Sequence, residues 1–101
     1  MDYVFEIKDA SGRIIYLTKE RWNHIKSDHP EMSVALDDIK HVLVSPELIR
    51  KSKYDENVRF YYKYYKERAS AAKHLLTAIK YLNGVGFVIT SFYTNKVKGE
   101  I

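Results

Sequence analysis

The stretch Thr18–Glu31, TKERWNHIKSDHPE, decides how the rest of the chain is interpreted. Its first residue is a good helix N-cap, because a threonine hydroxyl can accept a hydrogen bond from a free N–H of the first turn. Trp22 and Ile25 lie three residues apart and share a face, which predicts that the helix docks on a core through them. Pro30 disfavours a helical conformation in the residue before it, so the helix should end near Asp28.

A second stripe of this predicted helix is polar. Arg21, His24 and Asp28 follow one another at i, i+3 and i+7, away from the apolar pair. This helix therefore carries the strongest candidates for chemical function in the chain. A histidine that hydrogen-bonds a carbonyl or Asp28 and so fixes the helix is at least as good an interpretation of His24 as a catalytic role.

Composition bounds the class of protein. The chain has 101 residues, of which 46% are hydrophobic and 30% charged, which predicts a single globular domain over residues 1–101. It carries a net charge of +4 and no cysteine, which excludes disulfides and thiolate metal sites and suits a polyanionic partner. We expect no membrane span and no signal peptide, and a cytoplasmic setting is the simplest interpretation.

The order of the elements predicts an α+β domain in which an N-terminal hairpin and two helices pack on an antiparallel sheet of three to four strands. Turn residues 9–12 and 83–86 mark two hairpins. Ser33 is expected to cap the second helix. The expected elements are strands Tyr3–Ile7 and Arg13–Leu17, the helices Thr18–Asp28 and Val34–Val44, and strands Glu47–Lys53, Val58–Tyr65, His74–Leu82 and Phe87–Thr94.

The side chains of strand Val58–Tyr65 alternate between the two faces of the sheet. We expect the helices to pack on the face that carries Phe60 and Tyr62. The other face would present Arg59, Tyr61 and Lys63, joined by Lys80 from the next strand. Arginine and lysine can hold phosphates while tyrosine stacks on bases. The alternative is the ordinary solvated face of an antiparallel sheet.

Metal and cofactor chemistry is a poor fit to the sequence. His24 and His29 are five residues apart, about 140° around a helix, so they would not share a metal ion. His24 and Asp28 would supply only two ligands, which is too few for a protein zinc site. No glycine-rich phosphate loop is present, since the four glycines are scattered in turns. We therefore expect no metal and no cofactor.

The motif Arg21-Trp22-x-His24-Ile25, followed by His29-Pro30-Glu31, resembles the opening motif of phage-associated nuclease-like domains. These are grouped with barnase, EndoU, the colicin nucleases and the RelE toxins in the BECR fold. Later motifs match in the same order. They are Pro46-Glu47-x-Ile49, Arg59-x-Tyr61-Tyr62, Lys80 and the final strand Val88–Thr94. The resemblance runs from about Thr18 to Ile101, and its specificity lies in the order and spacing of the motifs.

The resemblance implies a fold of N-terminal helices on an antiparallel sheet, and metal-independent cleavage of RNA through attack of the ribose 2′-OH on the adjacent phosphate. DNA lacks that hydroxyl, so RNA would be the partner, and a protein inhibitor would accompany a toxin-like enzyme. The implied catalytic residues are His24 as base or acid, Arg21, Arg59 and Lys80 as phosphate cations, and Thr90 and Thr94 as hydrogen-bonding groups. The implied substrate-binding residues are Tyr61, Lys63 and Tyr93.

One position departs from the family pattern. The usual tyrosine of the last strand falls on Phe92, and Tyr93 is one place later, where it faces the other side of the sheet. Two alternatives to a nuclease therefore stay open. One is a non-catalytic nucleic-acid-binding module on the same fold, and the other is a protein-interaction module whose tyrosine-rich strand is an interface.

Overall fold

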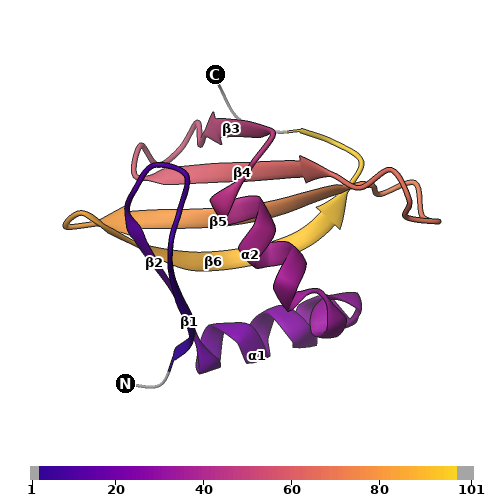
Figure 1. Cartoon of the computed structure of the whole chain (residues 1–101), viewed down its shortest axis with the longest axis horizontal. Helices are drawn as coiled ribbons and strands as arrows, with labels where there is room; N and C mark the ends of the chain where they lie inside the picture. The colour runs from indigo at the N-terminus through magenta and orange to yellow at the C-terminus, as the bar shows by residue number, and fades with distance from the viewer. Residues whose placement is uncertain (1–2, 98–101) are drawn as a thin grey trace.

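The computed structural model describes residues 3–97. In this part of the chain a hairpin and two helices precede a run of four strands, and the strands form one sheet with α2 across one of its faces (Figure 1). The elements are β1 Tyr3–Lys8, β2 Ile14–Thr18, α1 Lys19–Asp28, the 3-10 helix η1 Pro30–Val34, α2 Leu36–Val44, β3 Leu48–Lys51, β4 Val58–Tyr64, β5 His74–Leu82 and β6 Val85–Thr94.

The sheet corrects the predicted architecture. Over residues 3–97 it has six strands in the order β1-β2-β6-β5-β4-β3, and it is mixed, because β2 pairs with β6 in parallel through Ile15↔Gly86 and Tyr16↔Phe87. Neighbouring strands are otherwise antiparallel. The expectation of an antiparallel sheet of three to four strands was wrong because the N-terminal hairpin extends the sheet rather than packing on it. The α+β class holds.

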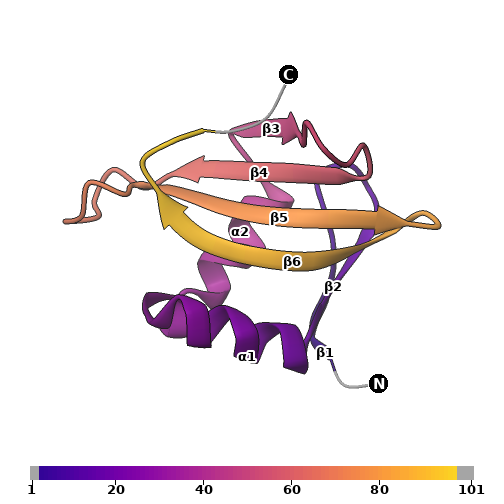
Figure 2. The same ribbon diagram turned by 180° about the vertical axis from the view of Figure 1, so that it is seen from behind.

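The first helix forms as its capping signals predict. The backbone N–H of Arg21 donates to Thr18 Oγ1 at 3.1 Å, and the helix ends at Asp28, where the N–H of His29 still reaches the carbonyl of Ile25. The helix lies alongside β6 in both views (Figures 1 and 2). Ile25 is buried and Trp22 packs against the core, as the sequence predicts.

The second helix begins later than predicted. Residues Pro30–Val34 form η1, and α2 starts at Leu36 with Ala35 at the N-cap position and no side-chain cap, so Ser33 does not cap it. The proline sets the first turn of η1, and the chain takes 3-10 rather than α geometry before α2 begins. Met32 and Ile39 are nevertheless fully buried, which confirms the apolar stripe.

The helices pack on the opposite face of β4 from the one predicted. Tyr61, 1% exposed, joins the core cluster that holds Ile25 and Ile39, whereas its neighbour Phe60 faces away from the helices. Alternation identified the two faces correctly but could not say which one the helices cover. The partner strand decides which face is buried, because Tyr61 pairs with Thr77, which is also fully buried.

A buried carboxylate ties the hairpin to the sheet. Asp9, 5% exposed, accepts hydrogen bonds from the hydroxyl groups of Tyr61 at 2.8 Å and of Tyr81. It also accepts bonds from Ser11 and from the backbone of Arg13. Burial alone would raise the pKa of Asp9, but these hydrogen bonds together hold it below its ordinary value. Burial also raises the pKa of both tyrosines, and the nearby carboxylate adds to the effect.

Candidate nucleic-acid interface

The face of the sheet opposite α2 is covered by no helix among residues 3–97 (Figure 2). We call it the open face, and the pairing register fixes its members, because directly paired residues point to the same side. It comprises Tyr16 of β2, Val85, Phe87, Thr90, Phe92 and Thr94 of β6, His74, Leu76, Ala78, Lys80 and Leu82 of β5, Val58, Phe60, Tyr62 and Tyr64 of β4, and Leu48 and Arg50 of β3. Of these, Val58, Tyr62, Leu76 and Ala78 are buried.

Aromatic rings run across the open face from β2 to β4. The rings of Tyr16 and Phe87 stack with their centroids 5.6 Å apart. Phe92, on the same strand as Phe87, and Phe60, on β4, are also partly exposed. Tyr64 is 46% exposed at the end of β4. Large rings that stay accessible on a sheet face are unusual for a purely solvated surface, which is normally polar.

Nitrogen groups lie among these rings. Arg50 is partly exposed and pairs with Phe60 across β3 and β4. His29 reaches the face from the end of α1, where its ring stacks on Phe92 with centroids 4.8 Å apart. His74 pairs with Thr94, and its ring lies 5.1 Å from that of Tyr64. The open face therefore offers stacking surfaces and hydrogen-bond donors together.

A shallow pocket of about 120 Å³ lies at the corner of this face where β4 ends. Its lining includes Glu47, Tyr64 and His74. The carboxylate of Glu47 accepts a hydrogen bond from the backbone N–H of Tyr64 at 2.5 Å, which fixes the acid at the rim. The pocket thus places a carboxylate, an imidazole and a phenol side by side.

The candidate residues on α1 lie on its solvent side. Arg21 and His24 are both exposed, and His24 Nε2 lies 4.0 Å from a carboxylate oxygen of Glu20. His24 lines a wide depression with Glu20 and with Asn23 and Ser27 of the same helix. Every residue of that lining belongs to α1, so Arg59 and Lys80 take no part in it.

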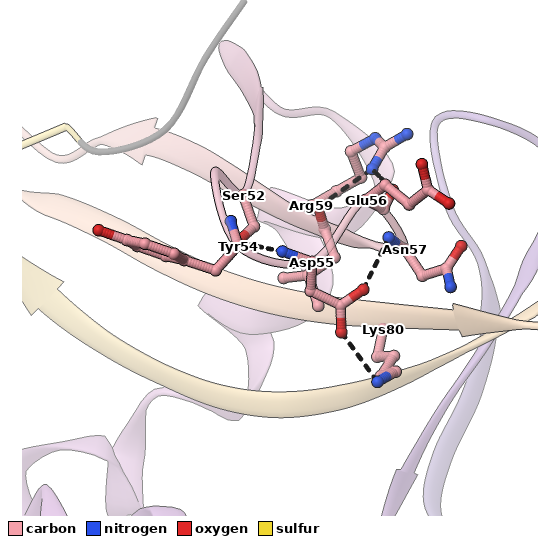
Figure 3. A network of polar contacts seen from close by, with 8 residues as sticks. Ser52, Tyr54, Asp55, Glu56, Asn57, Arg59 and Lys80 are labelled. Atoms are coloured by element: carbon pink, nitrogen blue, oxygen red, sulfur yellow. Dashed lines mark hydrogen bonds and ion pairs between the residues drawn. The ribbon is translucent and has the colours of Figure 1, made fainter.

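Arg59 and Lys80 come together with the β3–β4 turn rather than with α1 (Figure 3). Lys80 Nζ lies 2.9 Å from Asp55 Oδ2, and this bond is the main reason that the pKa of Asp55 is lowered. The guanidinium of Arg59 donates to the carbonyl oxygens of Glu56 and Val58. Lys80 pairs with Val58, so Arg59, the next residue of β4, points to the other face. The expected single cationic face of Arg59 and Lys80 is therefore wrong.

The three predicted substrate-binding residues all lie on the helix-covered side. Tyr61 is in the core and bonded to Asp9, so its ring cannot stack on a base. Lys63 donates to the carbonyl of Ser45 at 3.1 Å. Tyr93 donates to Asp38 Oδ2 at 2.8 Å, and Arg68 lies over its ring. Because these residues alternate with Phe60 and Phe92, the sequence could assign them to the opposite face of the sheet from those two rings. It could not show that this is the face covered by the helices.

Thr90 and Thr94 are the predicted site residues that share the open face with the aromatic rings and with Lys80. Sequence reasoning missed Phe60, Phe92, His29, His74 and Arg50 as members of one surface. The signal was present in part, because period-two alternation puts Phe92 on the same side as Thr90 and Thr94. The position of His74 required the pairing of β5 with β6, which the sequence does not state.

Among residues 3–97, no three histidine, cysteine, aspartate or glutamate side chains gather closely enough to hold a metal ion. Within the same range no helix is long and apolar enough to cross a membrane. Comparisons with models of protein families, with curated proteins and with solved structures found no match.

Proposed function

We propose that this protein binds single-stranded RNA on the open face of its sheet. The observation that carries the proposal is that Tyr16, Phe87, Phe60 and Phe92 all lie partly exposed on one face of the sheet. No helix in residues 3–97 covers that face. Stacking of a base on an aromatic side chain contributes about 1–3 kcal/mol and needs no particular base. The net charge of +4 adds attraction to phosphates. RNA rather than DNA is favoured by the sequence resemblance to RNA-cleaving domains.

Neighbouring cations on β3 give a matched test of this proposal. Arg50 belongs to the open face, whereas Lys51 pairs with Arg59 and points to the other side. Each substitution, Arg50→Ala or Lys51→Ala, removes one positive charge from the same short strand. Fluorescence anisotropy with a labelled single-stranded RNA measures the affinity at several salt concentrations.

We expect Arg50→Ala to weaken binding several-fold and to lower the salt dependence by about 0.7 in the logarithmic slope, the value for one phosphate contact on a single strand. Lys51→Ala should change affinity much less, because it removes only long-range attraction. An equal loss in both variants would indicate non-specific attraction to a basic protein. Unchanged binding in Arg50→Ala would contradict the proposed face.

Cleavage of RNA is the second candidate function, and the two imidazoles on the open face favour it. His29 and His74 flank the Phe92 and Thr94 end of β6, and histidine is the side chain most often used for proton transfer in catalysis. One imidazole would take the proton of the 2′-OH and the other would protonate the leaving oxygen. A toxin-like role in the cytoplasm, held in check by a protein inhibitor, belongs to this candidate and is supported by the resemblance alone.

The RNA from the same titrations, run on a denaturing gel after incubation in EDTA, separates the two candidates. If cleavage occurs, His74→Ala should slow it by about 10²–10⁴-fold, the usual contribution of general acid–base catalysis. His24→Ala is the control, because that side chain is exposed on α1. Loss of cleavage in His24→Ala alone would show that the active site lies on α1. If the RNA is bound tightly but stays intact, the protein binds RNA without cleaving it.

A further inference from the structure

A second cavity of about 260 Å³ lies on the other side of the protein. It is formed where η1 and the start of α2 meet the end of β6 and the loop between β4 and β5. Its volume is somewhat below the roughly 300–1,000 Å³ of sites for drug-sized ligands, which suits a smaller molecule. Nothing in the proposed binding of RNA uses this cavity.

Acidic groups supply its hydrogen-bond acceptors. Asp38, partly buried in α2, accepts a hydrogen bond from the hydroxyl of Tyr93 at 2.8 Å, and the Tyr65 hydroxyl lies close to the same carboxylate. Glu31 of η1 and Glu67 of the loop between β4 and β5 are exposed and also line the cavity. These carboxylates can receive an ammonium group, and the second oxygen of Asp38 is already held in place by the bond that its first oxygen makes.

Two hydrogen-bond donors also line this cavity, the Tyr65 hydroxyl and the guanidinium of Arg68. The Tyr65 hydroxyl is buried and, among residues 3–97, is the side-chain polar atom left without a hydrogen-bond partner, although the carboxylate of Asp38 is near. Burial and that carboxylate raise the pKa of Tyr65 to about 12, so the hydroxyl keeps its proton. A buried hydroxyl without a partner of good geometry costs free energy, and a ligand that accepts its hydrogen bond would recover that cost.

Arg68 is the second donor. Its guanidinium carbon lies 3.5 Å from the centroid of the Tyr93 ring, and its Nε donates to the carbonyl of Ala72 at 3.0 Å. Those contacts hold the group over the ring, while its terminal nitrogens make no hydrogen bond in the described part of the chain. An arginine fixed in this way is suited to a carboxylate, which it can bind through two parallel hydrogen bonds.

We propose that this cavity binds a free α-amino acid by its zwitterionic head, with the ammonium on Asp38 and Glu31 and the carboxylate on Tyr65 and Arg68. A peptide end would satisfy only one of the two charged sets, which is why a free amino acid fits better. Val34, 91% exposed at the rim, offers an apolar contact for the ligand's side chain.

Ligand titrations followed by two-dimensional NMR test this proposal with the common L-amino acids, each added alone. We expect at least one to shift the backbone signals of α2 and of the loop that carries Arg68. Its N-acetyl derivative lacks the ammonium and its amide lacks the carboxylate, so both should bind about tenfold or more weakly. No shift with any amino acid, or equal binding of either derivative, would overturn the proposal.

Variants locate the site. Tyr65→Phe removes only the buried hydroxyl and should weaken binding about tenfold, whereas Tyr64→Phe, its exposed neighbour on the open face, should not. Arg68→Gln provides a second test at a surface loop position, should a change at Tyr65 disturb the fold. Unchanged affinity in both Tyr65→Phe and Arg68→Gln would contradict the assignment.

Discussion

At the residue scale, the least expected feature is the set of hydrogen bonds around Asp9. The sequence presents it as an ordinary turn residue beside Ser11 and Gly12, and the turn does form. What the local pattern does not contain is that Tyr61 and Tyr81, more than 50 residues away, aim their hydroxyls at this turn. Alternation assigns a residue to a face, but the partner of a polar atom on that face depends on the tertiary fold.

Substitution of Asp9 measures what this arrangement contributes to stability. In Asp9→Ala the hydroxyls of Tyr61 and Tyr81, which lie 2.7 Å apart, keep only each other as partners, so one buried donor lacks an acceptor. The free energy of unfolding should therefore fall by about 1–3 kcal/mol. Urea denaturation at neutral pH measures the change. Asp55→Ala, which removes a solvent-screened partner of Lys80, is the control and should have little effect. A small loss for Asp9→Ala would show that water replaces the carboxylate.

The same group predicts how stability varies with pH. The pKa of Asp9 is lower in the folded protein than in the unfolded chain, where it is about 3.9. Its contribution is therefore complete above about pH 5 and is lost as the pH falls through the folded pKa. Denaturation curves of the Asp9→Ala variant should consequently show a weaker fall in stability with acid than those of the natural sequence.

At the element scale, local signals located most of the helices and strands, and long-range pairing set what they form together. The cap at Thr18, the proline after α1 and the Asn83-Gly84 turn each act over a few residues, and each appears as predicted. The pairing of β2 with β6 joins segments about 70 residues apart and has no local signature. Because of this parallel pairing, the sheet is mixed and not antiparallel as predicted.

Gly86 is the residue on which this parallel pairing depends. A Cβ atom at that position would lie 2.4 Å from Ile15 Cδ1 and 2.8 Å from Ile79 Cγ2. Gly86→Ala should therefore destabilise the protein by about 1–3 kcal/mol, the usual effect of overpacking a core, as measured by urea denaturation. Ile15→Val removes the closest atom and should recover part of that loss in the double variant. Strictly additive losses would show that the strand moves instead.

At the scale of the whole molecule, the sheet separates two surfaces of different chemistry. Its helix-covered side holds the core and ends in the cavity beside Asp38, while its open face carries rings and cations. The sequence predicted a strand face that combines cationic and aromatic residues. The open face has this composition, but it carries the other set of alternating residues of β4 and different residues from those predicted. The composition of a face could be anticipated from alternation. The choice of face could not, because it follows from which residues the partner strands bury.

The phenylalanines provide the most direct test of RNA binding on the open face. The chain has four, of which Phe60, Phe87 and Phe92 lie on that face, whereas Phe5 is 7% exposed in the core beneath the helices. Selective labelling of phenylalanine rings gives NMR signals that report stacking of bases upon them. Addition of a single-stranded RNA should shift the ring signals of Phe60, Phe87 and Phe92 and leave those of Phe5 nearly unchanged. Binding of RNA that moves none of the three rings would contradict the account.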